Sequence, residues 1–172
     1  TPGGAGRLVA ESTRPMGIGR EWETTPGGLS TDGSLLCLRH SDAGDMLHFG
    51  LRVIDLSTDE VLSELVDEGL NVRVASWSPT PGDQRVALIH ERDGIDRPAV
   101  WRPTTGERRD YTVDLPGEVD VADWYPDASA LLLIHWYDGR CQLYRLDLST
   151  GGCTLVHDPD GYRKELRSFL AT

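Results

Sequence analysis

The chain repeats itself about every 47 residues, and this period constrains its fold more than any other feature. An aromatic residue, a proline turn, an apolar run and a closing histidine recur with small changes in three segments, which are residues 28–40, 76–90 and 123–135. Trp77 and Trp124 are 47 positions apart, and Leu29, which takes the tryptophan's position in the first segment, lies 48 before Trp77. A repeat of this length predicts a row of similar units.

Eight residues mark the repeat, and each kind has a predicted structural role. A tryptophan at the start of each turn offers a large apolar area, which predicts packing between neighbouring units. Proline favours the turn that follows, and the histidine ends the apolar strand after it. We therefore interpret these positions as structural. They are Leu29, Trp77, Trp124, Pro79, Pro126, His40, His90 and His135.

Short apolar runs rich in Val, Ile and Leu, bounded by Gly, Pro, Asp or Ser, predict β-strands throughout the repeats. The predicted strands are 34–39, 49–55 and 60–65 in the first unit, 72–76, 85–90, 99–102 and 107–113 in the second, and 119–123, 130–135, 141–147 and 153–157 in the third. Residues 60–68 have helix-like spacing, but their position in the repeat is strand-like in the other units. Before the first unit, 7–10 predict a strand remnant and 14–19 a loop.

Two kinds of turn support the same register. A strand followed by a polar turn recurs at 53–60, 100–107 and 145–152. Hairpin signals with Asp and Gly lie between the second and third strands of each unit, at 42–45, 93–96 and 138–139. Glycine there accepts the positive φ that tight hairpins require. Each unit is thus predicted to be an antiparallel meander.

Four-stranded repeats of this length predict an all-β fold, a β-propeller segment of about three antiparallel blades with partial strands at both ends. The predicted divisions are a partial blade strand and loop at 1–28, blades at 29–69, 70–116 and 117–158, and the start of a next blade or a tail at 159–172. Propellers close with about four to eight blades, so three form an arc whose two terminal faces should expose apolar surface. We expect either a fragment of a longer polypeptide or two copies that close a ring.

The repeat marks also resemble a known family. The Trp-Ser-Pro turn at Trp77, the Asp-Gly hairpin at Asp138 and the Leu-Tyr-Arg-Leu-Asp-Leu-Ser-Thr-Gly run at 143–151 resemble blades of TolB-type propellers. More specifically, they resemble the propeller domain of the prolyl oligopeptidase family of serine peptidases, over residues 27–158. The WD-repeat family is a poorer match, because no Gly-His or Trp-Asp pair stands at the expected places.

The resemblance implies a non-catalytic propeller that covers an active site and restricts which peptides enter it. Its partners would be the remainder of its own propeller and a separate α/β-hydrolase domain, with a peptide as the substrate of the intact protein. The alternative is a TolB-type propeller that acts as a protein-binding module. In that case a second copy of this chain could complete the ring.

Catalytic, metal and cofactor sites are not predicted in this chain. The Gly-x-Ser-x-Gly elbow of serine hydrolases is absent from the sequence, and the repeat itself explains Ser30, Ser76 and Ser78. His40, His90 and His135 have carboxylates nearby in sequence, but equivalent positions in neighbouring blades lie on the order of 10 Å or more apart. Arg108-Arg109 is too short to form a basic patch.

The net charge argues against nucleic acid and membranes as partners, and the cysteines indicate reduced thiols. A formal net charge of −11 predicts repulsion from nucleic acid and from anionic membrane surfaces. The sequence has no apolar run long enough to span a membrane and no secretory signal, which predicts a soluble, cytoplasmic protein. Cys37, Cys141 and Cys153 fit neither a metal spacing nor a disulfide framework, so reduced thiols are expected.

Overall fold

Twelve β-strands form three antiparallel sheets of four strands each in the computed structural model, which describes residues 6–18, 28–42 and 47–158. The first sheet contains β1 (Met16–Ile18), β2 (Leu35–His40), β3 (Gly50–Asp55) and β4 (Glu60–Leu65). The second contains β5 (Val72–Trp77), β6 (Val86–His90), β7 (Arg97–Arg102) and β8 (Glu107–Asp110). The third contains β9 (Glu118–Trp124), β10 (Ala130–Tyr137), β11 (Arg140–Asp147) and β12 (Cys153–His157).

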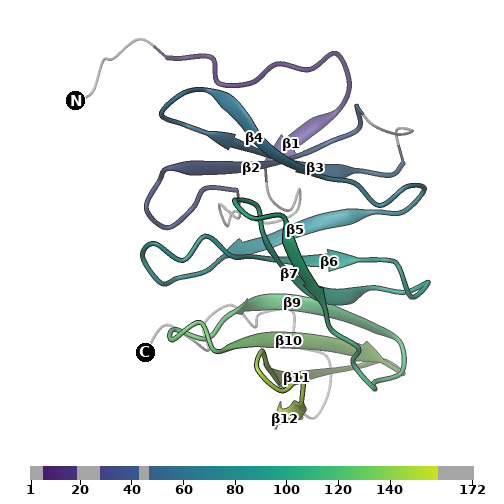
Figure 1. The fold of residues 1–172 in the computed structure, drawn as a ribbon. Helices are drawn as coiled ribbons and strands as arrows, with labels where there is room; N and C mark the ends of the chain where they lie inside the picture. The colour runs from purple at the N-terminus through teal and green to yellow at the C-terminus, as the bar shows by residue number, and fades with distance from the viewer. Residues whose placement is uncertain (1–5, 19–27, 43–46, 159–172) are drawn as a thin grey trace.

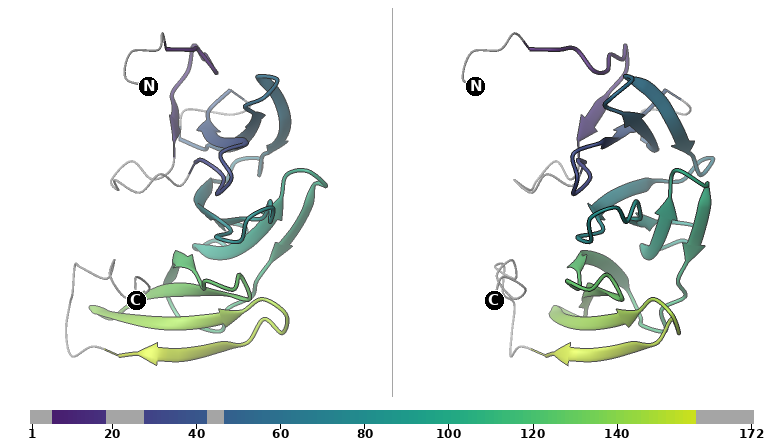
Figure 2. Two further views of the ribbon diagram at one scale, coloured as in Figure 1. Left: turned by 90° about the vertical axis from the view of Figure 1, so that its left-hand side faces the viewer. Right: turned by 60° about the vertical axis from the view of Figure 1, so that its left-hand side comes forward.

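Each sheet is a meander in which neighbours in sequence pair as neighbours in space. The three sheets stack one above another, with the first and third at opposite ends of the stack (Figures 1 and 2). The described residues contain no helix, and so none that is long and apolar enough to cross a membrane. The predicted all-β fold with four-stranded antiparallel units is therefore confirmed.

Strand β6 of the middle sheet is covered on both faces. All five residues of β6 are buried, and they alternate between two separate hydrophobic clusters. Val86 and Leu88 pack with the first sheet, whereas Ala87 and Ile89 pack with the third. Successive side chains of a strand point to opposite faces, so a strand covered on both sides reads as one continuous apolar run. This explains why the sequence predicts a strand at 85–90, where the structure has β6.

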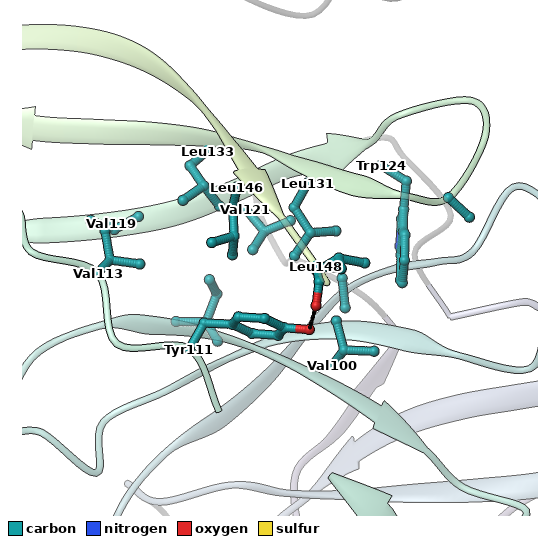
Figure 3. Close-up of a cluster of buried hydrophobic side chains, with 13 residues drawn as sticks. Val100, Tyr111, Val113, Val119, Val121, Trp124, Leu131, Leu133, Leu146 and Leu148 are labelled. Carbon is teal, nitrogen blue, oxygen red and sulfur yellow. Dashed lines mark hydrogen bonds between the residues drawn. The ribbon is translucent and has the colours of Figure 1, made fainter. Parts of the chain in front are cut away.

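The second cluster of the core lies between the middle and third sheets. Figure 3 shows Tyr111 and Val100 on one side and Leu131, Leu133 and Leu146 on the other. The Tyr111 hydroxyl donates a hydrogen bond to the Leu148 carbonyl over 3.1 Å. The predicted strand 107–113 ends early, at Asp110, because the chain then turns inward and buries Tyr111 and Val113 between the sheets.

The first sheet differs from the prediction at its innermost strand. Residues 7–10 form no strand, and Leu8 is 73% exposed. The fourth strand is instead Met16–Ile18, inside the segment predicted to be a loop, and it pairs with β2. A Cβ on Gly17 would lie 3.0 Å from Arg39 Nε, so this glycine makes room for a side chain from the next strand. Gly17 therefore belongs to a paired strand and not to the predicted loop at 14–19.

The terminal face of the first sheet is less exposed than we expected. On the side of the first sheet away from the second, Leu38 and Ile54 are buried. The segment before β1 lies over this end of the stack (Figure 1), and the Arg7 guanidinium donates to the Leu56 carbonyl at 2.9 Å. Leu29, in contrast, remains 45% exposed. The predicted tail or next blade at 159–172, the hairpin residues 43–46, and residues 1–5 and 19–27 of the predicted partial blade lie outside the described residues.

The three cysteines are free thiols. Cys141 and Cys153 lie on adjacent strands, but Cys153 pairs with Leu146, so the two sulfurs are not brought into register. Burial raises the pKa of all three thiols, to about 12 for Cys37, which keeps them protonated near neutral pH.

Candidate functional site

The two tryptophans of the repeat lie at the junctions between sheets. The Trp77 indole Nε1 donates to the Gly28 carbonyl of the preceding unit at 2.8 Å, and Trp124 Nε1 donates to the Ser76 carbonyl at 3.0 Å. Both indoles are buried, with 6% and 2% exposure. Trp77 and Trp124, each the last residue of the first strand of its sheet, therefore contact the preceding unit through packing and one hydrogen bond.

The turn after each of these positions is closed by the same backbone hydrogen bond. Ser30 N donates to Leu35 O, Ser78 N to Arg85 O and Tyr125 N to Ala130 O, all between 2.8 and 2.9 Å. Pro79 and Pro126 lie exposed in these turns. Neighbouring turns are also tied together, because Thr31 Oγ1 donates to the Ser78 carbonyl at 2.6 Å and the Arg85 guanidinium to the Ala128 carbonyl at 3.0 Å.

His40 and His90 are buried at the opposite end of the strands and have one geometry. The ring Nδ1 of each accepts a hydrogen bond from the backbone N–H two residues later, Asp42 N at 3.3 Å and Arg92 N at 3.2 Å. In the neutral ring the proton is therefore on Nε2. Burial lowers the pKa of both imidazoles, so both are neutral near pH 7.

His135 departs from this geometry although it occupies the same repeat position. Its Nε2 donates to the Pro116 carbonyl at 2.5 Å, and its Nδ1 lies 3.2 Å from Gln142 Oε1. Its ring stacks on Tyr137 and meets Tyr144 edge-on. Within residues 6–18, 28–42 and 47–158, none of these three histidines is hydrogen-bonded to a serine hydroxyl, and each ring contacts its own sheet or the adjoining loop.

A buried ion-pair cluster joins the first and second sheets, and sequence reasoning missed it. Asp67, in the connection between β4 and β5, accepts hydrogen bonds from Arg92 at 2.5 Å and from Arg108 Nη1 at 3.0 Å to both carboxylate oxygens. Asp110 pairs with the same two arginines. The side chain of Asp67 is only 2% exposed and that of Arg108 8%. His90 Nε2 adjoins the cluster, 3.8 Å from Asp110 Oδ1.

The two carboxylates and two guanidinium groups of this cluster balance each other's charge, and Asp67 stays ionised within it. Burial works to raise the pKa of Asp67, but the hydrogen bonds from Arg92 and Arg108 outweigh it and hold that pKa below its ordinary value. A carboxylate whose pKa is held low by two guanidinium groups stays ionised near neutral pH and is a poor proton acceptor for catalysis. Arg108 of the Arg108-Arg109 pair is thus buried against two carboxylates, Asp67 and Asp110.

A second polar group lies at the same end of the sheets. Asn71 Oδ1 accepts from Phe49 N at 3.1 Å, and Asn71 N donates to Glu91 Oε2 at 3.1 Å. Arg73 pairs with Asp96 at 2.5 Å beside it. No group of three or more His, Cys, Asp or Glu side chains within residues 6–18, 28–42 and 47–158 is arranged to hold a metal ion.

Comparison with known proteins places this arrangement in a fold. TolB from Acinetobacter baumannii superposes with a TM-score of 0.61 at 19% identity, covering 86% of this chain and 33% of that one. A putative TolB from Agrobacterium tumefaciens gives 0.57 at 20% identity, covering 88% and 50%. The three sheets are β-propeller blades. A puromycin hydrolase variant complexed with PGG gives 0.52 at 19% identity, covering 76% of this chain and 21% of the hydrolase.

These likenesses are structural. No family model matches the sequence, and no curated protein does. The chain spans about a third to a half of the length of the two TolB structures. The part of the resemblance that concerns TolB-type propellers is therefore supported at the level of fold, and the more specific assignment to prolyl oligopeptidases is a proposal.

Proposed function

We propose that this chain is a non-catalytic part of a β-propeller domain that restricts the access of peptides to a separate α/β-hydrolase domain, as in prolyl-oligopeptidase-like serine peptidases. In this proposal three blades pack with further blades to close the ring. The likeness to the propeller of a puromycin hydrolase and the repeat marks around Trp77 and 143–151 support it.

The observation that carries the non-catalytic part is how the polar side chains are used. The groups with catalytic potential, His40, His90 and Asp67, are buried and engaged in holding blade to blade or loop to strand. A general base needs access to the proton that it removes, and a nucleophile needs a base within hydrogen-bond reach. Neither arrangement exists among the described residues around these histidines.

A fluorophosphonate probe tests the proposal. The 172-residue chain alone should not be labelled, whereas the longest natural polypeptide that contains it should be labelled on a serine outside these residues. Labelling within the chain would overturn the non-catalytic assignment. An unlabelled full-length protein would overturn the peptidase assignment, but it would not affect the assignment of the β-propeller fold.

A second candidate is a TolB-type propeller that binds a protein partner, completed by a second copy of this chain. The exposed Leu29, at the position where the other two blades bury a tryptophan, favours this candidate because it leaves an apolar contact position uncovered. Light scattering after size-exclusion chromatography tests it. A dimer that Leu29→Asp converts to monomer supports ring closure by pairing, and a monomeric wild type refutes it.

A further inference from the structure

A pocket of about 210 Å³ lies between the second and third blades, at the end of the strands away from the buried histidines. Three arginines line it: Arg85 before β6, Arg102 at the end of β7 and Arg109 on β8. The chain as a whole is strongly acidic, with a net charge of −11, so three guanidinium groups around one hollow stand out. We call it the arginine pocket.

The three guanidinium groups differ in what they already bind. Arg85 is neutralised by Asp83, at 2.6 Å, and lies over the Trp124 ring. Arg109 donates to the Leu148 carbonyl at 2.6 Å and to the Ser149 carbonyl at 3.4 Å, and it lies over the Tyr111 ring at 4.7 Å from the centroid. These contacts use hydrogen-bonding capacity but leave its charge unbalanced. Arg102 makes no side-chain hydrogen bond or ion pair with any part of the chain that the structure describes. Arg102 is therefore the guanidinium that is available to a ligand.

The pocket carries one acidic side chain and an apolar floor. Glu107 lies directly across the strand pair from Arg102, yet the two form no ion pair in the described structure. Val100, Leu148 and the ring of Tyr111 line the apolar side of the pocket and form its floor; Figure 3 shows these three side chains within the buried cluster. Burial raises the pKa of Tyr111, so its hydroxyl keeps its proton and remains bonded to the Leu148 carbonyl.

Charge and size together define the ligand. With Arg85 balanced by Asp83, the lining has two positive groups against the one carboxylate of Glu107, a net charge of about +1. A guanidinium and a carboxylate form charge-assisted, bidentate hydrogen bonds. An apolar cavity of about 150 Å³ is enough for benzene, whereas drug-sized ligands occupy roughly 300 Å³ or more. The pocket thus suits one ring or a short aliphatic chain.

We propose that the arginine pocket binds a small organic monocarboxylate, with the carboxylate on Arg102 and the apolar body on the floor. This site goes beyond the proposed gating role and does not depend on it. Because the three arginines belong to the second blade and Leu148 of the floor to the third, the bound acid would contact both blades and add to the contact between them.

Ligand-observed NMR titration with benzoate tests the proposal, with benzamide as the neutral ligand of the same shape. The wild-type chain should bind benzoate saturably and benzamide at least tenfold more weakly, because a hydrogen bond to a charged group contributes most of the affinity. Arg102→Gln should weaken benzoate binding about tenfold or more. Glu107→Gln should strengthen it severalfold by removing a like charge.

Arg140→Gln is the matched control, since Arg140 lies exposed in the hairpin at the other end of β11 from the pocket. It should bind benzoate as the wild type does. Circular dichroism should show that all three variants keep the native fold. Unsaturable benzoate binding, equal binding of benzamide, or unchanged affinity in Arg102→Gln would each overturn the proposal.

Discussion

Replacing Trp77 with phenylalanine tests whether the indole is what joins the first two blades. The ring is 6% exposed, and its Nε1 donates to the Gly28 carbonyl at 2.8 Å. That carbonyl also accepts from Cys37 N at 2.6 Å, so it keeps one partner in the variant. The lost hydrogen bond should therefore cost only its net value, about 1 kcal/mol.

The smaller ring adds a packing cost. Loss of the pyrrole part removes on the order of 40 Å² of buried surface, which costs about 1 kcal/mol at roughly 25 cal/mol/Å². The expected loss in the free energy of unfolding of Trp77→Phe is thus about 2 kcal/mol. For a chain of this size that corresponds to a fall in Tm of about 4–8 °C.

Urea titration followed by far-UV circular dichroism measures this loss without relying on tryptophan fluorescence. Trp124→Phe should cost a similar amount, because its indole has the same hydrogen bond and is as deeply buried. Leu29→Ala, at the equivalent but half-exposed position, should cost about 1 kcal/mol or less. A Trp77→Phe cost below about 0.5 kcal/mol, or no larger than that of Leu29→Ala, would refute the argument.

Further substitutions test the ion pairs, the buried imidazole and one turn. Asp67→Asn should lower the free energy of unfolding by about 3 kcal/mol at pH 7 in urea titrations, because a buried guanidinium loses its partner. The pKa of Asp67 is depressed in the folded protein, so the stabilisation that its carboxylate provides is present above about pH 4 and is lost as pH falls through the folded pKa. The free energy of unfolding of Asp67→Asn should lack this dependence on pH. Burial also lowers the pKa of His90, so stability should fall as pH drops below about 6.5, and less steeply in His90→Gln. Calorimetry should show that Gly117→Ala costs more than Gly94→Ala: both glycines have positive φ, but only at Gly117 does a Cβ meet the Trp136 carbonyl, at 2.9 Å.

Each of these expectations has a control or a contrary outcome. Glu60→Gln removes an exposed carboxylate from the edge strand β4 and should change stability by less than about 0.5 kcal/mol. If it costs as much as Asp67→Asn, net charge and not the buried cluster explains the effect. Identical pH profiles for wild type and His90→Gln would contradict the role given to burial, and equal costs at the two glycines would contradict the steric argument.

The repeat made most of the strands predictable from sequence. Inner strands such as β6 read as apolar runs because both of their faces are buried. The outer strand Glu60–Leu65 is mostly exposed and has helix-like spacing, and only its place in the repeat identified it as a strand. The first strand was predicted at 7–10 but lies at Met16–Ile18, because pairing with β2 and the space above Gly17 decided its position.

The polar contacts between blades could not be predicted in the same way. Asp67 lies 25 residues from Arg92 and 41 from Arg108, and the three meet only because the blades stack. No equivalent trio recurs among the described residues of the other units, so periodicity gives no signal for these three residues. The arginine pocket could not be predicted from the sequence either, because Arg102 and Leu148 come from different blades and neither is unusual in its local sequence.

The tryptophan hydrogen bond gives the row of blades a polarity. Each indole donates to the backbone of the blade before it, from Trp77 to Gly28 and from Trp124 to Ser76. The acceptor is in each case the residue just before the repeat mark, a place that Asp123 holds in the third blade. A blade added after the third one therefore finds a carbonyl in the acceptor position. A blade placed before the first meets the side chain of Leu29, which has no donor to offer, so that junction would depend on apolar contact alone.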